Sequence, residues 1–194
     1  MFRKIYNGLF YSSCAVIVGF CLVGAAYVSG KMPEKVSVKE VEKLVQVERS
    51  EPSFNELLQT VPAQYGISPL LVSAMVKQES GGKKDAIRFE PSQMARAAKF
   101  TRDADQQRML ASSHCRLQVM GYNAAALGIS WSELYDDQTC IEVSMKILKD
   151  CFDRHREKHK IDQMRGALAC YNGSTTYADA VLASIAEKLL EENL

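Results

Sequence analysis

Apolar positions recur every three to four residues along one short stretch of the chain, and this stripe ends on an acidic residue. Leu71, Met75 and Glu79 are spaced four residues apart, which places all three on one face of a helix. Ser68-Pro69 is typical of a helix start, and Gly81-Gly82 is typical of a helix end. The pattern therefore predicts a helix whose buried face ends on a carboxylate.

Glu79 is unusual at that position, because glutamate is seldom fully buried without a partner. A carboxyl group on an apolar face loses solvation, and its pKa rises. A carboxylic acid that stays protonated near neutral pH can act as a general acid. The alternative is that Glu79 ends the stripe with its side chain turned out into solvent.

Downstream of Ser53, the pattern predicts an all-α domain over residues 54–194. Ser53 and Glu56 form a capping box that begins a helix through about Gln64. No convincing run has the two-residue period of a strand, and Asp85–Pro91 reads as a polar loop. Further helices are predicted at Ser92–Phe100, at Asp103–Leu110, at Leu117–Leu127, from a Thr139 cap through Phe152, from an Asp162 cap to Tyr171-Asn172-Gly173, and at a last stripe of Tyr177, Val181, Ile185 and Leu189.

Residues 1–30 predict an N-terminal membrane anchor or signal segment. Arg3 and Lys4 precede a run without charges from Ile5 to Gly30, and a spanning helix needs roughly 20 apolar residues. Charges before the span favour a cytoplasmic N-terminus, so we expect a single-pass inner-membrane protein with its domain in the periplasm. The alternative is a signal peptide cleaved near Gly24-Ala25-Ala26, with secretion to the periplasm. We favour the anchor because the apolar run continues through Tyr27-Val28.

Between this segment and the helical domain, residues 31–53 read as a charged linker. Lysine, glutamate and valine alternate there over too short a distance to argue for a coiled coil. The predicted role of the linker is to carry the domain away from the membrane.

Composition narrows the partners and cofactors. The chain has a formal net charge of +1 and no concentrated basic region, which argues against a nucleic-acid partner. His155 and His159 lie four residues apart on a predicted helix, but they lack the His-Glu-x-x-His order of metalloproteases. A solvated charged face is the simpler role for this pair. We therefore predict no metal and no cofactor.

Three segments, taken in order, resemble a known family. They are Gln78-Glu79-Ser80-Gly81-Gly82 with Ala86–Pro91, then Leu117-Gln118-Val119-Met120-Gly121, then Ala167–Gly173 with its Tyr-Asn-Gly end. Together they are similar to the lysozyme-like lytic transglycosylases (SLT domain), especially the phage-type branch, over about residues 54–186. The resemblance implies a lysozyme-like helical domain that acts on peptidoglycan glycan strands. Such enzymes often serve a secretion, conjugation or phage-derived envelope complex, which is the partner that the resemblance suggests.

The family implies a single catalytic carboxylate, which falls on Glu79. The acid protonates the glycosidic oxygen between N-acetylmuramic acid and N-acetylglucosamine. The carboxylate then takes a proton from the C6 hydroxyl of the same muramic residue, which gives a 1,6-anhydro product. Glycoside hydrolases usually need two carboxylates, whereas an internal hydroxyl with a high effective concentration removes that need. Asp85 and Glu90 lie nearby in sequence, and we expect both to be solvated loop charges, with Arg88 as a partner for Glu90.

The resemblance also suggests substrate-binding residues. Tyr171 is expected to donate a hydrogen bond near the catalytic acid, with Asn172 shaping the turn beside it. Gln118 and Met120 are expected to line the glycan cleft, although core packing is an equal alternative for Met120. Ser113 is a candidate contact for an N-acetyl group, and the neighbouring His114 is either a loop residue or a substrate contact.

Two positions depart from the family, which usually has Gly-Leu-Met-Gln where this chain has Cys115-Arg116-Leu117-Gln118. The family glycine allows backbone and sugar to approach closely, so a side chain at Cys115 is expected to narrow or re-route the cleft. This departure motivates an alternative function, a catalytically weak glycan-binding or scaffold protein. A lysozyme-like hydrolase is the third alternative.

Four cysteines fall in the part predicted to be exported, where an even number favours disulfides. Cys140 and Cys151 are expected on one helix, about 16 Å apart at roughly 1.5 Å per residue. A disulfide needs Cα atoms within about 7 Å, so these two cannot bond each other. The remaining pairings are 115–140 with 151–170, or 115–151 with 140–170. The alternative is that Cys115, Cys140, Cys151 and Cys170 are buried free thiols.

Overall fold

A computed structural model describes residues 51–191, so the predicted membrane segment and nearly all of the linker lie outside the described residues. All described residues except Glu51 belong to one unit, Pro52–Leu194. Between residues 51 and 191, no helix is both long enough and apolar enough to span a membrane.

The first two helices of the described residues form where the sequence predicts them. Helix α3 (Phe54–Gln64) begins at a complete capping box between Ser53 and Glu56. Helix α4 (Pro69–Ser80) has proline in its first position and ends at Gly81, whose left-handed backbone (φ 61°) suits a glycine. The apolar stripe of α4 is buried, with Met75 fully inaccessible and Leu71 nearly so. The predicted helix and its buried face are therefore confirmed.

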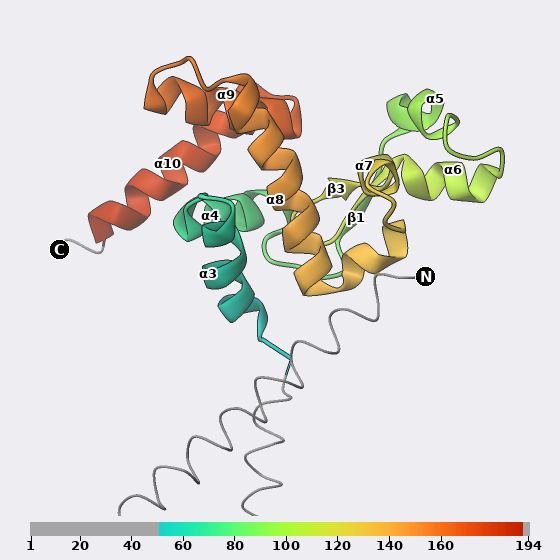
Figure 1. The fold of residues 1–194 in the computed structure, drawn as a ribbon, viewed down its shortest axis with the longest axis horizontal. Coiled ribbons are helices and arrows are strands. Elements are labelled where there is room, and N and C mark those ends of the chain that lie inside the picture. The colour runs from blue at the N-terminus through green and yellow to red at the C-terminus, as the bar shows by residue number, and fades with distance from the viewer. Residues whose placement is uncertain (1–50, 192–194) are drawn as a thin grey trace, which may run out of the picture. The chain divides into compact units, whose positions relative to one another are not determined.

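Three longer helices complete the main core. They are α8 (Asp137–Arg154), α9 (Lys160–Asn172) and α10 (Thr175–Glu191). Helix α8 packs against α3 and α9, and α10 packs against α9 and α4 (Figure 1). Their facing sides bury one continuous apolar cluster, which includes Val72, Met75, Ile141, Met145, Leu148, Leu168 and Val181.

Two predicted helix starts are wrong. Helix α8 begins one turn earlier than Thr139, because the Asp136 carboxylate caps it and accepts from the Thr139 backbone N–H at 2.8 Å. Helix α9 begins at Lys160 rather than at Asp162, with His159 in the N-cap position. In both cases Thr139 and Asp162 lie inside the first turn, where acidic and hydroxyl side chains are also common.

The domain is mainly helical, as predicted, but it also contains three short strands that the sequence pattern did not indicate. Strands β1 (Ile87–Phe89), β2 (Ser112–His114) and β3 (Val119–Met120) form an antiparallel sheet in that order. Strands of two or three residues are too short to show a periodic pattern. The predicted helix from Leu117 to Leu127 is accordingly wrong in its first part, and α7 spans only Gly121–Ala126.

The register of the sheet sorts side chains between two environments. Arg88 of β1 pairs with Ser113 of β2, which in turn pairs with Met120 of β3. Neighbouring positions on a strand point to opposite faces, and His114 and Val119 are buried on the other face. One row of side chains is therefore available to a cavity, while His114 and Val119 of the next row are buried.

The remaining short elements surround the sheet with a smaller core. They are η1 (Pro91–Gln93), α5 (Met94–Ala97), α6 (Ala104–Leu110), α7 and η2 (Trp131–Tyr135). This smaller core buries Ala97, Leu110, Ala111 and Tyr122. Gly121 is needed here, because a Cβ would lie only 2.7 Å from the Met109 carbonyl oxygen. Figure 1 shows α5, α6 and α7 on one side of α8 and helices α3, α4, α9 and α10 on the other.

His114 is a core residue and not a surface loop residue. It is fully buried, and its Nε2–H donates to the Met109 carbonyl oxygen at 2.8 Å. Its other ring nitrogen, Nδ1, lies 3.1 Å from the Tyr135 hydroxyl, and its ring stacks on Trp131. Burial lowers the pKa of His114. The expectation of a loop histidine or substrate contact is therefore replaced by a neutral packing role.

Two disulfides join the sheet and α9 to α8. Cys115 bonds Cys140, and Cys151 bonds Cys170. This is one of the two pairings that remained after the same-helix pair was excluded. The first bond fixes the turn between β2 and β3 to the start of α8. The second bond fixes the C-terminal part of α9 to the C-terminal part of α8.

We predict that replacing Cys151 and Cys170 together by serine lowers the free energy of unfolding by about 3 kcal/mol, because the bond closes a short loop in the unfolded chain. The separation of the two cysteines is 19 residues. Urea unfolding of the wild type and the double variant, monitored by circular dichroism, measures the difference. An unchanged midpoint would show that this disulfide does not constrain the domain.

Candidate active site

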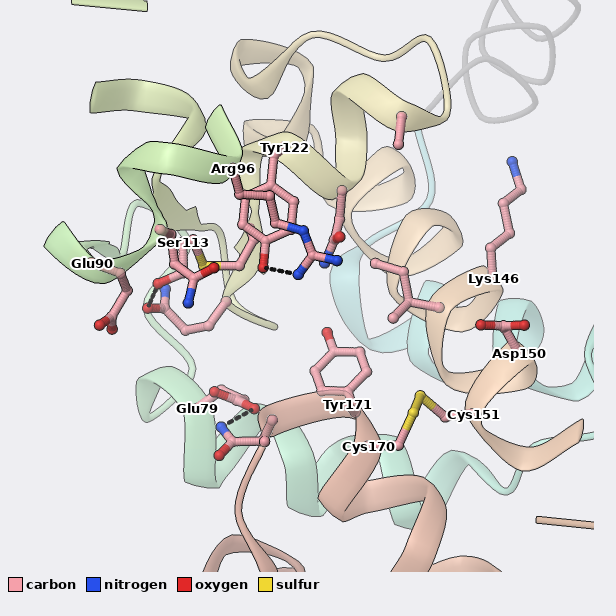
Figure 2. Close-up of a pocket in the computed structure, with 18 of the residues that line it drawn as sticks. Glu79, Glu90, Arg96, Ser113, Tyr122, Lys146, Asp150, Cys151, Cys170 and Tyr171 are labelled. Atoms are coloured by element: carbon pink, nitrogen blue, oxygen red, sulfur yellow. Dashed lines mark hydrogen bonds between the residues drawn. A yellow bond between two sulfur atoms is a disulfide. The ribbon is translucent and has the colours of Figure 1, made fainter. Parts of the chain in front are cut away.

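The Glu79 side chain lines a cavity of the domain. It lies in the last turn of α4, and its carboxyl group is half-buried at the edge of a cavity of about 680 Å³. The walls come from the sheet, α5 and α7 on one side and from α8 and the end of α9 on the other (Figure 2). A volume of this size lies within the range of about 300–1,000 Å³ that is typical of ligand sites.

Burial raises the pKa of Glu79, because the ionised carboxylate loses water without gaining a full set of partners. Three neighbours act in the opposite direction: the Tyr177 hydroxyl, the Asn172 amide and the Arg88 guanidinium. The Asn172 Nδ2–H donates to Glu79 Oε1 at 3.3 Å. Desolvation remains the largest cause, so the carboxyl group stays protonated to a higher pH than an exposed glutamate.

Tyr177 is a site residue that the sequence pattern places only in an apolar stripe. Its side chain is buried, and its hydroxyl has no hydrogen-bond partner in ideal geometry among the described residues. The hydroxyl nevertheless lies close enough to Glu79 to favour the ionised carboxylate, and catalytic hydrogen bonds are often long before substrate binds. Burial and the Glu79 carboxyl raise the pKa of Tyr177, so its hydroxyl keeps its proton. The available signal was a polar tip on an otherwise aliphatic stripe.

The other two carboxylates that line the cavity each form an ion pair with an arginine side chain. Glu90 Oε1 lies 2.6 Å from Arg88 Nε, as the sequence suggested, and Asp150 pairs with Arg154 one turn along α8. Within the part of the cavity that the structure describes, Glu79 is the one carboxylate without a cation at ion-pair distance. It is therefore the carboxyl group best suited to exchange a proton.

Gln118 and Ser113 line the cavity and also brace each other. The Ser113 hydroxyl donates to Gln118 Oε1 at 2.6 Å. The Gln118 Nε2 group donates to the carbonyl oxygens of Ala86 at 3.1 Å and Cys115 at 3.0 Å. Both amide protons are thus committed to the protein, and the groups left for a ligand are the acceptor lone pairs of the two side chains.

Tyr171 and Met120 also line the cavity. The predicted hydrogen bond from Tyr171 to Glu79 is absent among the described residues, because the Tyr171 hydroxyl binds another group. The Tyr171 hydroxyl donates to the Leu117 carbonyl oxygen at 2.8 Å, which ties the end of α9 to the turn between β2 and β3. The hydrogen bond to Glu79 comes instead from the next residue, Asn172. Met120 packs on the smaller core while it faces the cavity, so it combines both roles that the sequence suggested.

Cys115 and Arg116 do not line the cavity, so neither side chain narrows or re-routes it directly. Cys115 is 1% exposed, bonded to Cys140, and has a positive φ of 64°, a backbone conformation that favours glycine. Its side chain is directed into the main core.

Arg116 also lies outside the cavity and braces the end of α4. Its guanidinium lies 3.0 Å from Asp137, stacks over the Phe54 ring and donates to the Gly82 carbonyl oxygen. In return, the Ser80 hydroxyl donates to the Arg116 carbonyl oxygen at 2.8 Å. These contacts hold the residues that follow Glu79.

Between residues 51 and 191, no group of three or more His, Cys, Asp or Glu side chains is arranged to hold a metal ion. The chain matches no protein-family model, no curated protein and no solved structure. The functional conclusion therefore rests on the side chains around Glu79.

We predict that Tyr177→Phe and Asn172→Ala each raise the pKa of Glu79, because each removes a donor that favours the carboxylate. Carbon-13 NMR titration of the glutamate carboxyl groups measures the shift, with the Glu79 signal assigned by its loss in Glu79→Gln. Tyr135→Phe is the matched control, since that hydroxyl lies against His114 and outside the cavity. A Glu79 titration that moves to lower pH in Tyr177→Phe would contradict the assigned contact.

We predict that Glu79→Gln increases thermal stability at pH 7.5 and gives no gain at pH 4. The folded-state pKa of Glu79 is raised above its ordinary value of 4.5. Its contribution to stability is therefore present below pH 4.5 and is lost as the pH rises through the folded-state value. Melting temperatures at the two pH values measure the effect, and Glu90→Gln, which strands Arg88, should show no such gain. An equal change at both pH values would contradict the buried-carboxyl explanation.

Proposed function

We propose that this protein is a peptidoglycan lytic transglycosylase with a lysozyme-like helical domain, and that Glu79 acts first as general acid and then as general base. The observation that carries the proposal is the position of Glu79. It is a half-buried carboxyl group with a raised pKa, and it is the carboxylate without a cation partner in the described cavity. The order of the three sequence segments that contain Glu79, Gln118 and Tyr171 supports the same family.

In the proposed first step, protonated Glu79 donates its proton to the oxygen that links N-acetylmuramic acid to N-acetylglucosamine. The bond between that oxygen and C1 of the muramic residue breaks, and the electron pair leaves with N-acetylglucosamine as an alcohol. In the second step, the Glu79 carboxylate takes the proton of the C6 hydroxyl, whose oxygen bonds to C1. The products are a 1,6-anhydro sugar and a free glycan end, Glu79 is protonated again, and no water is consumed.

The neighbours of Glu79 match the needs of the two steps. Desolvation favours the protonated form that the first step requires. Asn172 donates to Oε1 and Tyr177 lies beside the carboxyl group, so both stabilise the carboxylate that appears between the steps. A group that must give and then take one proton benefits from a pKa held between these opposing influences.

A lysozyme-like hydrolase is the second candidate, and Glu90 is the observation that favours it. A hydrolase needs a second carboxylate on the cavity wall to hold water or the sugar, and Glu90 lines the same cavity. Its ion pair with Arg88 occupies that carboxylate in this structure. The scaffold alternative rested on Cys115 and Arg116, and both side chains lie outside the cavity.

For the cellular setting we propose a periplasmic domain carried by an N-terminal inner-membrane segment. The two disulfides support an oxidising compartment, because such bonds are rare where thiols are kept reduced. A secretion, conjugation or phage-derived envelope complex is the proposed partner, since such machines need local openings in the cell wall.

We predict that the purified protein releases 1,6-anhydro muropeptides from murein, and that Glu79→Gln reduces this rate by about 10²–10⁴-fold. Mass spectrometry of the products measures both. Glu90→Gln is the matched control, because it alters a carboxylate of the same cavity, and it should keep substantial activity. Reducing-end products that carry oxygen from isotopically heavy water and depend on Glu90 would identify a hydrolase. Binding to murein without any product would identify a scaffold.

A further inference from the structure

The cavity contains two cations that the proposed chemistry does not use. Arg96 of α5 and Lys146 of α8 both line it. Within residues 51–191, no carboxylate lies at ion-pair distance from either side chain. The ion pairs Arg88–Glu90 and Arg154–Asp150 are each neutral as a pair. With Glu79 protonated, the cavity wall therefore carries an excess of positive charge.

Arg96 is held in place before any ligand binds. Its guanidinium stacks on the Tyr122 ring, 4.7 Å from the centroid, and one terminal nitrogen lies 3.4 Å from the Tyr122 hydroxyl. Tyr122 is itself buried in the smaller core, and Ala97 beside Arg96 is fully inaccessible. A charged group fixed on a buried ring loses little side-chain freedom when it binds. The remaining N–H groups of Arg96 have no acceptor that the structure records.

The position of Arg96 separates it from the proton-transfer site. Figure 2 shows Arg96 and Tyr122 reaching into the cavity from the wall opposite Tyr171, with Glu79 to one side of them and Lys146 on the α8 side. Lys146 lies one helical turn before Asp150, whose carboxylate is taken by Arg154. The two unpaired cations therefore come from different walls of one cavity.

The chemistry of these cations selects part of the substrate. The glycan backbone carries hydroxyl and N-acetyl groups, which are neutral. Its negative charge lies on the substituent at O3 of each muramic residue, either the lactyl carboxylate itself or the carboxylates of an attached peptide. The planar fork of arginine matches a carboxylate with two parallel hydrogen bonds.

We propose that Arg96 forms a subsite for a carboxylate on the O3 substituent of the muramic residue, and that Lys146 adds positive charge from the α8 wall of the same cavity. The subsite rests on the proposed transglycosylase function and adds a source of substrate selectivity to it. Because it does not touch the bond that breaks, it contributes uniform binding energy. Its loss raises KM and leaves kcat unchanged.

The test measures steady-state cleavage by the full-length protein on four soluble glycan strands. They are peptide-bearing strands, the same strands with carboxylates converted to neutral amides by carbodiimide and methylamine, peptide-free strands with lactyl carboxylates, and peptide-free strands amidated in the same way. The variants are Arg96→Gln, Lys146→Gln and the double variant. Arg102→Gln and Lys149→Gln are matched controls, since both side chains lie outside the cavity.

For the wild type we expect amidation to raise KM about tenfold with little change in kcat, which is the scale of one charge-assisted hydrogen bond. The double variant should show the high KM on charged strands and no further rise after amidation. A rise only with peptide-bearing strands assigns the peptide carboxylate, and a rise only with peptide-free strands assigns the lactyl carboxylate. Both controls should behave as the wild type.

Equal KM values for charged and amidated strands, or a double variant that still responds to amidation, would overturn the subsite and leave the proposed function intact. Absence of anhydro products from every strand would instead overturn the proposed function. In that case, co-sedimentation of the wild type and the double variant with insoluble murein before and after amidation still tests the carboxylate subsite. Binding that is independent of amidation in both proteins would exclude it.

Discussion

The domain depends on one short turn with an unusual backbone, Cys115–Gln118, which connects β2 to β3. Both ends of the turn have positive φ, 64° at Cys115 and 48° at Gln118, a conformation that costs of order 1–3 kcal/mol for a residue other than glycine. The surrounding contacts compensate for this cost. A disulfide joins the turn to Cys140 on α8, the Tyr171 hydroxyl binds a turn carbonyl from α9, and the Ser80 hydroxyl binds another from α4. Three helices therefore converge on four residues.

This convergence explains why Glu79 is where it is. Ser80 and Tyr171 are the chain neighbours of Glu79 and Asn172, so anchoring the first pair to the turn brings the second pair together. The stable part of the domain thus holds a destabilising group, a carboxyl whose pKa is raised by burial. The contacts around the turn do not involve the Glu79 carboxyl group. They can therefore offset the free-energy cost of burying it. Ser80 and Tyr171 thus stabilise the fold, while their chain neighbours Glu79 and Asn172 form the proposed site.

The sequence could predict those features that depend on local signals. The start of α3 follows from a capping box and the end of α4 from Gly81, and the same stripe that buries Met75 places Glu79 at the cavity. The strands could not be predicted, because two or three residues carry no period and their pairing joins distant segments. Tyr177 and Arg96 were missed for a related reason. An aromatic residue on a helical stripe is ordinarily part of the core, and only tertiary packing brings Tyr177 beside Glu79. An arginine on the surface is ordinarily solvated, and only tertiary packing places Arg96 over the Tyr122 ring.

Cys115 shows how a residue with a side chain can be held in a backbone conformation that glycine adopts most easily. Glycine adopts a left-handed conformation without steric cost, and any other residue needs outside support. Here the added side chain provides that support itself, since its sulfur bonds Cys140 in the core and not in the cavity. The Arg116 side chain is also directed away from the cavity, because its guanidinium contacts Asp137, the Phe54 ring and the Gly82 carbonyl. The rigidity of the turn thus depends on an intact disulfide, and neither Cys115 nor Arg116 lines the cavity.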